Sequence, residues 1–264
     1  MRFGVCISPL DDNTLTTLAD AGFDFVEGHV QRHLVPEESD EAFDTALKAI
    51  EKIPLPMEAA CCFFPGDLKL VGPEVDTARV DRYVRTACQR AECVGIRTLV
   101  IGSGGARTAP EGFDGKAALD QLAGHFVRWG PIAQAFGVML AIEPLRHDDT
   151  NVVNTLIEGA DLVDRTGHKH VQLLADSWHM NEVDEPAAHI EVVGRRLAHV
   201  HVAEAPERTP PGEKYGTEEF REFFAELKKA AYNGRISIEA RWSDTPADQL
   251  RIALSTLKEA FEQA

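Results

Sequence analysis

Short apolar runs alternate with longer amphipathic stretches along the whole chain. The apolar runs have the length of buried strands, whereas the stretches between them repeat apolar residues at helical spacing. The clearest of these stretches carries Val80, Tyr83, Val84, Ala87 and Cys88 on one face. The pattern predicts eight strands and eight helices in strict alternation.

The predicted elements fall into one continuous βα series. The strands are Arg2–Ile7, Asp24–Glu27, Pro56–Cys61, Arg97–Gly102, Val138–Glu143, Val171–Asp176, Leu197–His201 and Arg235–Glu239. The helices lie near Asp12–Ala21, Asp40–Lys52, 80–94, 119–136, Val152–Thr166, Pro186–Val193, Glu218–Ala231 and Pro246–Glu262. Strict alternation specifies a parallel sheet, and right-handed crossovers close it into a barrel. We expect a single (β/α)8 TIM barrel over residues 1–264, a length typical of that fold.

A doubly wound open sheet is the alternative arrangement. That fold normally has a phosphate loop or a dinucleotide fingerprint after its first strand, and Ile7-Ser8-Pro9-Leu10 contains neither. The Gly-rich turn Gly102-Ser103-Gly104-Gly105 follows the fourth strand and indicates a backbone that passes close to a ligand. The closed barrel is therefore the favoured interpretation.

The composition narrows the range of partners. A formal net charge of −16 argues against nucleic acid and against an anionic membrane surface. The N-terminal segment 1–7 has the pattern of a strand rather than of a signal peptide, and no run reaches the ~18 apolar residues of a membrane span. We expect a cytoplasmic protein, and the sequence leaves a homo-oligomer open. Reduced, buried thiols are expected for the five cysteines, Cys6, Cys61, Cys62, Cys88 and Cys93.

Four predicted strands in the second half end in a side chain that can bind a metal. These residues are Glu143, Asp176, His201 and Glu239. In a parallel sheet the four ends meet at one edge, where three carboxylates would repel one another without a cation. Oxygen and imidazole ligands suit one Mn²⁺, Mg²⁺ or Co²⁺ ion, with Zn²⁺ as a further candidate. Because the set has no thiolate, a structural zinc site is not expected.

Two further residues are candidates for holding a substrate. His179 lies three residues after Asp176, in a strand-to-helix turn, where it can hydrogen-bond a substrate oxygen. Arg208 lies in the proline-rich loop 203–212 and can hold a hydroxyl, carboxylate or enolate oxygen. His199 and His201 point to the same side of their strand. We assign His201 to the metal and His199 to the core below it, although the sequence also allows the reverse.

Several segments of the second half resemble motifs of the sugar isomerase/epimerase superfamily of xylose-isomerase-like barrels. Ile142-Glu143-Pro144-Leu145 resembles its fifth-strand motif, and Ile238-Glu239 corresponds to its eighth-strand glutamate. Asp176-Ser177-Trp178-His179-Met180 is similar to its Asp-x-x-His-Met signature, which is the most specific match. The loop 203–212 looks like the hydroxypyruvate isomerase pattern Ala-Asp-x-Pro-Gly-Arg-x-x-Pro-Gly. Ketose 3-epimerases have the arginine six residues after the histidine ligand, a place that Glu207 takes here, so the substrate stays open.

The resemblance implies a metal-dependent isomerase or epimerase of a keto-sugar or a small hydroxy-keto acid. It implies a divalent cation on Glu143, Asp176, His201 and Glu239, and an acid/base pair formed by Glu143 and Glu239. His179 and Arg208 would orient the oxygens of a small carbohydrate. In the chemistry that these roles allow, one glutamate removes a proton beside a ketone and the other returns it through an enediolate.

Three alternatives remain at this point. The same site can dehydrate a keto-inositol or another keto-sugar. An apurinic-endonuclease-like zinc hydrolase would place histidines at the third and fourth strand ends, where this chain has Cys61-Cys62 and Gly102-Ser103. A sugar-binding protein without turnover would not need both Glu143 and Glu239.

Overall fold

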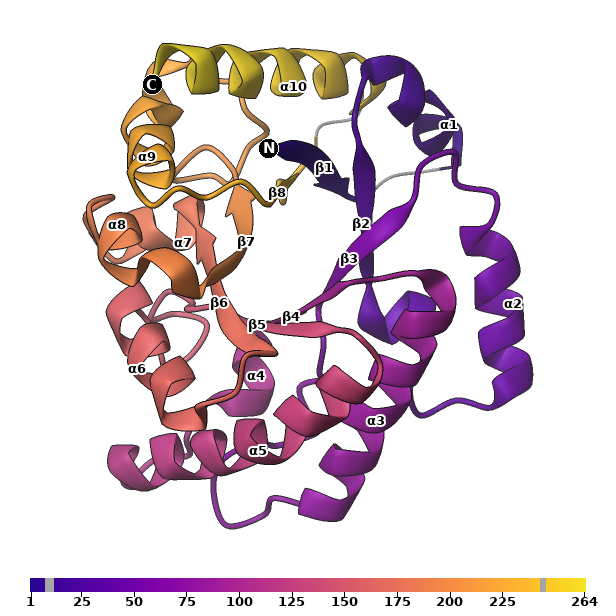
Figure 1. Cartoon of the computed structure of the whole chain (residues 1–264), viewed down its shortest axis with the longest axis vertical. Coiled ribbons are helices and arrows are strands. Elements are labelled where there is room, and N and C mark those ends of the chain that lie inside the picture. Colours follow the sequence, from indigo (N-terminus) through magenta and orange to yellow (C-terminus); the bar gives the residue numbers. More distant parts are fainter. Residues whose placement is uncertain (8–11, 243–245) are drawn as a thin grey trace.

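Eight parallel strands close into a barrel in the computed structural model, which describes residues 1–7, 12–242 and 246–264 (Figure 1). Each strand pairs with the next along the chain, and β8 pairs with β1 to complete the ring. The strands are β1 (Arg2–Cys6), β2 (Phe25–His29), β3 (Met57–Cys61), β4 (Thr98–Ile101), β5 (Met139–Ile142), β6 (Val171–Asp176), β7 (Leu197–Val202) and β8 (Arg235–Ile238). The predicted (β/α)8 barrel is confirmed. Ser8–Leu10, in which the sequence shows no phosphate loop, lie outside the described residues.

Helices surround the barrel (Figure 1). They are α1 (Asp12–Ala21), α2 (Asp40–Ile50), α3 (Thr77–Val94), α4 (Gly104–Arg107), α5 (Gly115–Ala135), α6 (Leu156–Thr166), α7 (Ser177–Glu182), α8 (His189–Val193), α9 (Glu218–Lys229) and α10 (Pro246–Gln263), with the short turns η1 (Val30–Leu34) and η2 (Gly194–Arg196). The apolar stripe predicted for α3 is buried. That helix ends at Gly95, whose φ of 95° is the left-handed conformation that glycine adopts most easily.

The structure corrects several predicted boundaries. The helix predicted from Val152 begins at Leu156, because Thr155 and Glu158 form a capping box that fixes its first turn. Val152 and Val153 are instead buried in the preceding loop. The helix predicted from Pro186 is shorter, and α4, α7 and η1 were not predicted at all. All three are short and begin within three residues of a strand end, so the sequence has no separate apolar stripe that would predict them.

Two further expectations concern the burial of the cysteines and the absence of a membrane-spanning helix. All five cysteines are free, but only Cys6, Cys61 and Cys88 are buried; Cys62 and Cys93 are exposed, contrary to the prediction. Among the described residues, no helix is both long enough and apolar enough to cross a membrane.

Candidate active site

The four predicted metal ligands meet at the carboxyl end of the barrel. Glu143 and Glu239 directly follow β5 and β8, while Asp176 and His201 lie in β6 and β7. Asp176 and His201 are register partners on neighbouring strands. One potential ligand atom from each of the four residues lies within 4.8 Å of those of the others. Parallel pairing therefore brings together side chains that are far apart in the sequence.

His201 lies at the centre of this cluster and is fully buried. Its Nδ1 atom is 3.1 Å from Oε1 of Glu143 and 3.1 Å from Oε2 of Glu239. Its Nε2–H group donates to Oε1 of Glu27 at 3.0 Å. Burial alone would lower the pKa of His201, but the surrounding carboxylates outweigh burial and raise it. The hydrogen bond to Glu27 turns Nδ1 toward the carboxylates.

Glu27 is a buried residue of the site that the sequence analysis missed. Its other oxygen, Oε2, accepts a 2.7 Å hydrogen bond from Nε2 of His199, so one carboxylate joins the two histidines. Burial would raise the pKa of Glu27, but His201 and His199 outweigh it and lower the pKa. His199 is fully buried, as predicted for a core residue. The available signal was the same as for the four ligands, an acidic residue at the end of an apolar strand.

The two carboxylate oxygens of Asp176 have different roles: one caps a helix, and the other faces the cluster. Oδ1 caps α7 by accepting from the backbone N–H groups of Trp178, at 2.8 Å, and His179, at 3.3 Å. Oδ2 faces the cluster, where it accepts from Nη2 of Arg208 at 3.2 Å. The cap fixes the carboxylate in one orientation, which leaves a single oxygen for a ligand role.

Arg208 places a guanidinium group among the acidic residues. Besides Asp176, its Nη2 donates to Oε2 of Glu239, and its Nε donates to the Glu239 carbonyl at 3.1 Å. The guanidinium carbon also lies 4.5 Å from the ring centroid of Trp178. Burial would raise the pKa of Glu239, but Arg208 and His201 lower it to about 2. In contrast, burial raises the pKa of Glu143, so the environment separates the two glutamates.

A second buried carboxylate outside the predicted set holds the loop that carries Arg208. Glu204 is fully buried. It accepts from Oγ1 of Thr209 at 2.9 Å and from three backbone N–H groups, those of Gly212 at 2.7 Å, Lys214 at 2.9 Å and Tyr215 at 3.1 Å. Since both oxygens have partners within the loop, Glu204 positions Arg208 rather than taking part in the cluster.

A cavity of about 250 Å³ opens onto the cluster, and His179 lines it. Nδ1 of His179 accepts from the backbone N–H of Arg146 at 3.1 Å, which leaves the Nε2–H group as a donor. The Gly-rich turn passes close to Glu143, because a Cβ atom on Gly102 would lie 2.3 Å from Glu143 Oε2. The lining residues are Cys61, Cys62, Ser103, Gly104, Gly105, Glu143, Leu145, Asp149, His179, Arg208 and Glu239.

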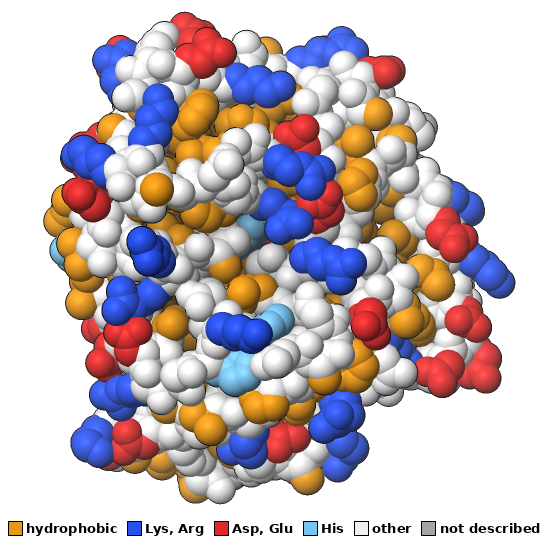
Figure 2. Space-filling view, in the orientation of Figure 1, with side chains coloured by type: hydrophobic (Ala, Val, Ile, Leu, Met, Phe, Trp, Pro, Cys, Tyr) orange, Lys and Arg blue, Asp and Glu red, His pale blue; other side chains and the backbone are white. Residues whose placement is uncertain are grey.

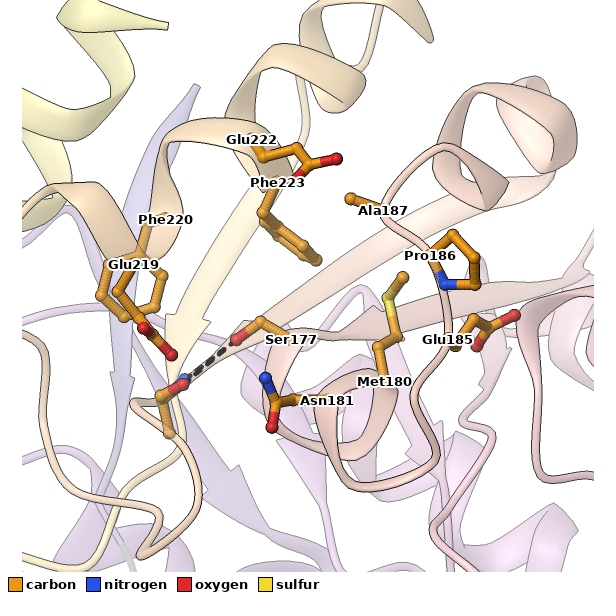
Figure 3. Close-up of a pocket in the computed structure, with 11 residues that line it drawn as sticks. Ser177, Met180, Asn181, Glu185, Pro186, Ala187, Glu219, Phe220, Glu222 and Phe223 are labelled. Atoms are coloured by element: carbon orange, nitrogen blue, oxygen red, sulfur yellow. Dashed lines mark hydrogen bonds between the residues drawn. The ribbon is translucent and has the colours of Figure 1, made fainter.

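Another cavity, of about 260 Å³, lies between the α7–α8 segment and α9 (Figure 3). Apolar side chains such as Phe220 and Phe223 line it together with the acidic Glu219 and Glu222. Ser177, whose hydroxyl donates to the Ala203 carbonyl at 3.3 Å, forms part of its wall. None of the six predicted site residues lines this cavity, so it is separate from the carboxylate cluster.

The cluster fits a divalent cation. Three carboxylate oxygens and one imidazole nitrogen surround a single point, a donor set that suits Mn²⁺, Mg²⁺ or Co²⁺. The Arg208 guanidinium already occupies part of this negative environment, where it contacts Asp176 and Glu239. Without a cation, the same charges would hold His201 in its protonated form.

Comparison with known proteins agrees with this architecture. Residues 15–260 match the model of a family described as the xylose isomerase-like TIM barrel. The chain belongs to that family. The resemblance predicted from the strand-end motifs is therefore confirmed.

Sugar epimerases are among the relatives. The chain is 26% identical over 222 residues to the 3-dehydro-D-guloside 4-epimerase of Escherichia coli, covering 80% of this chain and 82% of that enzyme. It is 28% identical over 233 residues to the D-psicose 3-epimerase of Agrobacterium fabrum, covering 84% and 76%. The structure of D-allulose 3-epimerase from Methylomonas sp. superposes with a TM-score of 0.83 at 21% identity, covering 98% of each chain. The predicted class, an enzyme of the sugar isomerase and epimerase group, is confirmed.

Proposed function

We propose that this protein is a divalent-cation-dependent epimerase of a keto-sugar that acts by proton transfer through an enediolate. One observation carries the proposal: Glu143 and Glu239 approach the same ring nitrogen of His201 from two different strands, each at 3.1 Å. Two carboxylates that flank one point can act on the two faces of a substrate bound between them. Relatives that epimerise D-psicose and 3-dehydro-D-guloside support this class of substrate.

The two glutamates have the different proton affinities that such a reaction needs. Glu239, beside the Arg208 guanidinium that lowers its pKa, is the ionised group that takes a proton from the carbon next to the ketone. The electron pair of that C–H bond moves to the carbonyl oxygen and gives an enediolate. Glu143, whose pKa is raised by burial, is the acid that returns a proton to the opposite face. After one turnover the pair has exchanged protonation states and can run the reverse reaction.

The remaining site residues hold the substrate and the developing charge. A divalent cation on Glu143, Asp176, His201 and Glu239 would stabilise negative charge on the substrate oxygens. The Nε2–H group of His179 donates to one substrate oxygen from the wall of the cavity. Arg208, held by the loop around Glu204, provides a positive group beside Glu239. A cavity of about 250 Å³ suits a small sugar rather than a polymer.

Proton exchange in D₂O tests the proposal. The Mg²⁺-loaded protein is incubated with D-psicose, D-fructose, L-ribulose and a 3-keto-glycoside, and deuterium incorporation is followed by NMR. We expect deuterium on the carbon next to a carbonyl of at least one substrate, and its position distinguishes 3- from 4-epimerisation. Removing the cation with EDTA should abolish exchange, and adding it back should restore it.

Two variants and one control make the assignment specific. Glu239→Gln and Glu143→Gln should each slow exchange by ~10²–10⁴-fold, the usual contribution of a general acid or base. Glu111→Gln, which changes an exposed glutamate away from the site, should exchange at the wild-type rate. A metal-loaded protein that exchanges no substrate proton, or that exchanges equally well in all three variants, would contradict the epimerase assignment.

A further inference from the structure

A basic concavity lies at the amino end of the barrel, opposite the carboxylate cluster. It has a volume of about 440 Å³, and its wall is built from residues at the beginnings of β4 to β8. Arg97, Arg195, Arg235 and His170 contribute to this wall, and in the described part of the chain no aspartate or glutamate side chain does. The view of Figure 1 looks onto this end, where β1 begins, and Figure 2 shows Lys and Arg side chains gathered around the middle of the face.

The positive charge of this concavity is only partly neutralised. Arg235 donates from Nε to Oε2 of Glu58 at 2.6 Å, but Arg2 also takes Glu58, at 2.5 Å from its Oε1. One carboxylate therefore serves two guanidinium groups. Among the residues that the structure describes, no carboxylate lies within ion-pair distance of Arg97 or Arg195. The chain has a net charge of −16, so carboxylates are plentiful elsewhere. Ion pairing within the protein therefore does not explain why these arginines lie together in this concavity.

The surroundings favour a small anion over solvent alone. Arg235 and His170 are half-buried, so part of their hydration is already lost and an anion gains more from them than from fully exposed side chains, whereas Arg97 and Arg195 are exposed at the rim. A guanidinium group offers parallel N–H donors that match two oxygens of a phosphate or carboxylate. The volume falls within the range of small-molecule sites.

We propose that this concavity is a binding site for a small anion that carries a phosphate or carboxylate group, with Arg97, Arg195 and Arg235 as its partners. The site is independent of the proposed epimerase reaction, because none of the residues of the carboxylate cluster contributes to its wall. It gives the protein a second ligand site, at the opposite end of the barrel from the first.

Calorimetric titration of the Mg²⁺-loaded full-length protein tests the proposal. Inorganic phosphate, sulfate and succinate are titrated separately at constant ionic strength into the wild type, an Arg97→Gln/Arg195→Gln double variant and an Arg85→Gln control. Within residues 1–7, 12–242 and 246–264, neither Arg97 nor Arg195 has a carboxylate partner, so the double variant leaves no described acid unpaired. Arg85 is an exposed arginine on α3, away from the concavity.

We expect saturable one-to-one binding of at least one anion to the wild type and the control. The double variant should bind it roughly tenfold or more weakly, because it loses two charged hydrogen-bond donors. Preference for phosphate and sulfate would identify a tetrahedral oxyanion site, and preference for succinate a carboxylate site. Equal affinity in the double variant would place the binding elsewhere, for example at Arg208, and overturn the proposal, as would the absence of saturable binding. Circular dichroism checks that the variants fold, and Arg195→Gln alone serves if the double variant does not.

Discussion

The two ends of the barrel carry opposite charge, and they satisfy that charge in different ways. At the carboxyl end the acidic groups are buried, or partly buried in the case of Glu239, and have partners within the cluster, namely two histidines and one arginine. At the amino end the basic groups are only half-buried or exposed, and two arginines have no carboxylate partner in the described part of the chain. The first end has the donor set and the geometry of the proposed cation site. The second has charge that only a ligand from outside would neutralise.

Arginine has a different role at each end of the barrel. Arg208 lies in the acidic cluster and lowers the pKa of Glu239, so it belongs to the chemistry of the carboxyl end. Arg235 shares Glu58 with Arg2 and closes the opposite end of the barrel. Strand β8 thus begins at the basic end and leads directly to Glu239 at the acidic end. Substitutions at one end of the barrel should therefore leave ligand binding at the other end unchanged.

The largest effect is expected from Asp176→Asn. Asparagine caps a helix about as well as aspartate, so Oδ1 should still hold α7 and stability should change little. The lost charge would cost ~4 kcal/mol of cation binding at an effective dielectric constant of ~20, or roughly a thousandfold in affinity. Titration calorimetry of EDTA-treated protein with Mn²⁺ measures this loss, and urea unfolding checks the stability. Unchanged Mn²⁺ affinity would show that Asp176 is not a ligand.

A smaller loss is expected from Glu27→Gln. Glutamine keeps one of the two oxygens that accept from His199 and His201, and it removes the charge that orients and polarises the His201 ring. Losing such an outer carboxylate typically costs 10–100-fold in metal affinity. Glu226→Gln, at a buried glutamate on the outer helix α9, is the matched control and should bind Mn²⁺ normally. If both variants bind equally well, Glu27 has only a structural role.

Cation binding should also depend on pH, with a sign fixed by His201. The carboxylates raise the pKa of this ring, so below that raised value the metal-free protein holds a proton that a cation must displace. Affinity should therefore rise by about tenfold per pH unit and level off once the ring is neutral. Calorimetry in buffers of different ionisation enthalpy should detect about one proton released per Mn²⁺ ion in the lower range. Affinity that stays constant as the pH falls would mean that His201 is neutral before the cation binds.

The sequence predicted the site better than it predicted the surroundings of the site. Glu143, Asp176, His201 and Glu239 could be found because a parallel barrel brings all strand ends to one edge, so position along the strand is enough. Glu27 ends the predicted strand Asp24–Glu27, so the same rule could have found it, but in the structure β2 continues to His29. A register irregularity between Val26 and Glu27 alters the pairing of β2 with β3, and such bulges redirect side chains without a sequence signature.

The basic end shows a second limit of sequence analysis. Arg97, Arg195 and Arg235 come from three separate segments of the chain, and each lies near a strand start. Nothing in their local sequence distinguishes them from other surface arginines. These arginines come together only because the barrel closes, and the net charge of the chain does not reveal such a local cluster.

The smallest expected effect comes from Glu58→Gln, which sharpens the contrast between the two ends. The variant removes the carboxylate that Arg2 and Arg235 share and makes the amino end more positive. Because a surface ion pair is worth at most ~1 kcal/mol, phosphate affinity should rise only about two- to fivefold. Mn²⁺ affinity at the carboxyl end should stay within about twofold of the wild type, since Glu58 lies near the start of β3, at the opposite end of the barrel, and salt weakens interactions between separated charges. The same calorimetric titrations measure both quantities. Weaker phosphate binding would show that Glu58 acts by holding Arg235 in place rather than by cancelling its charge.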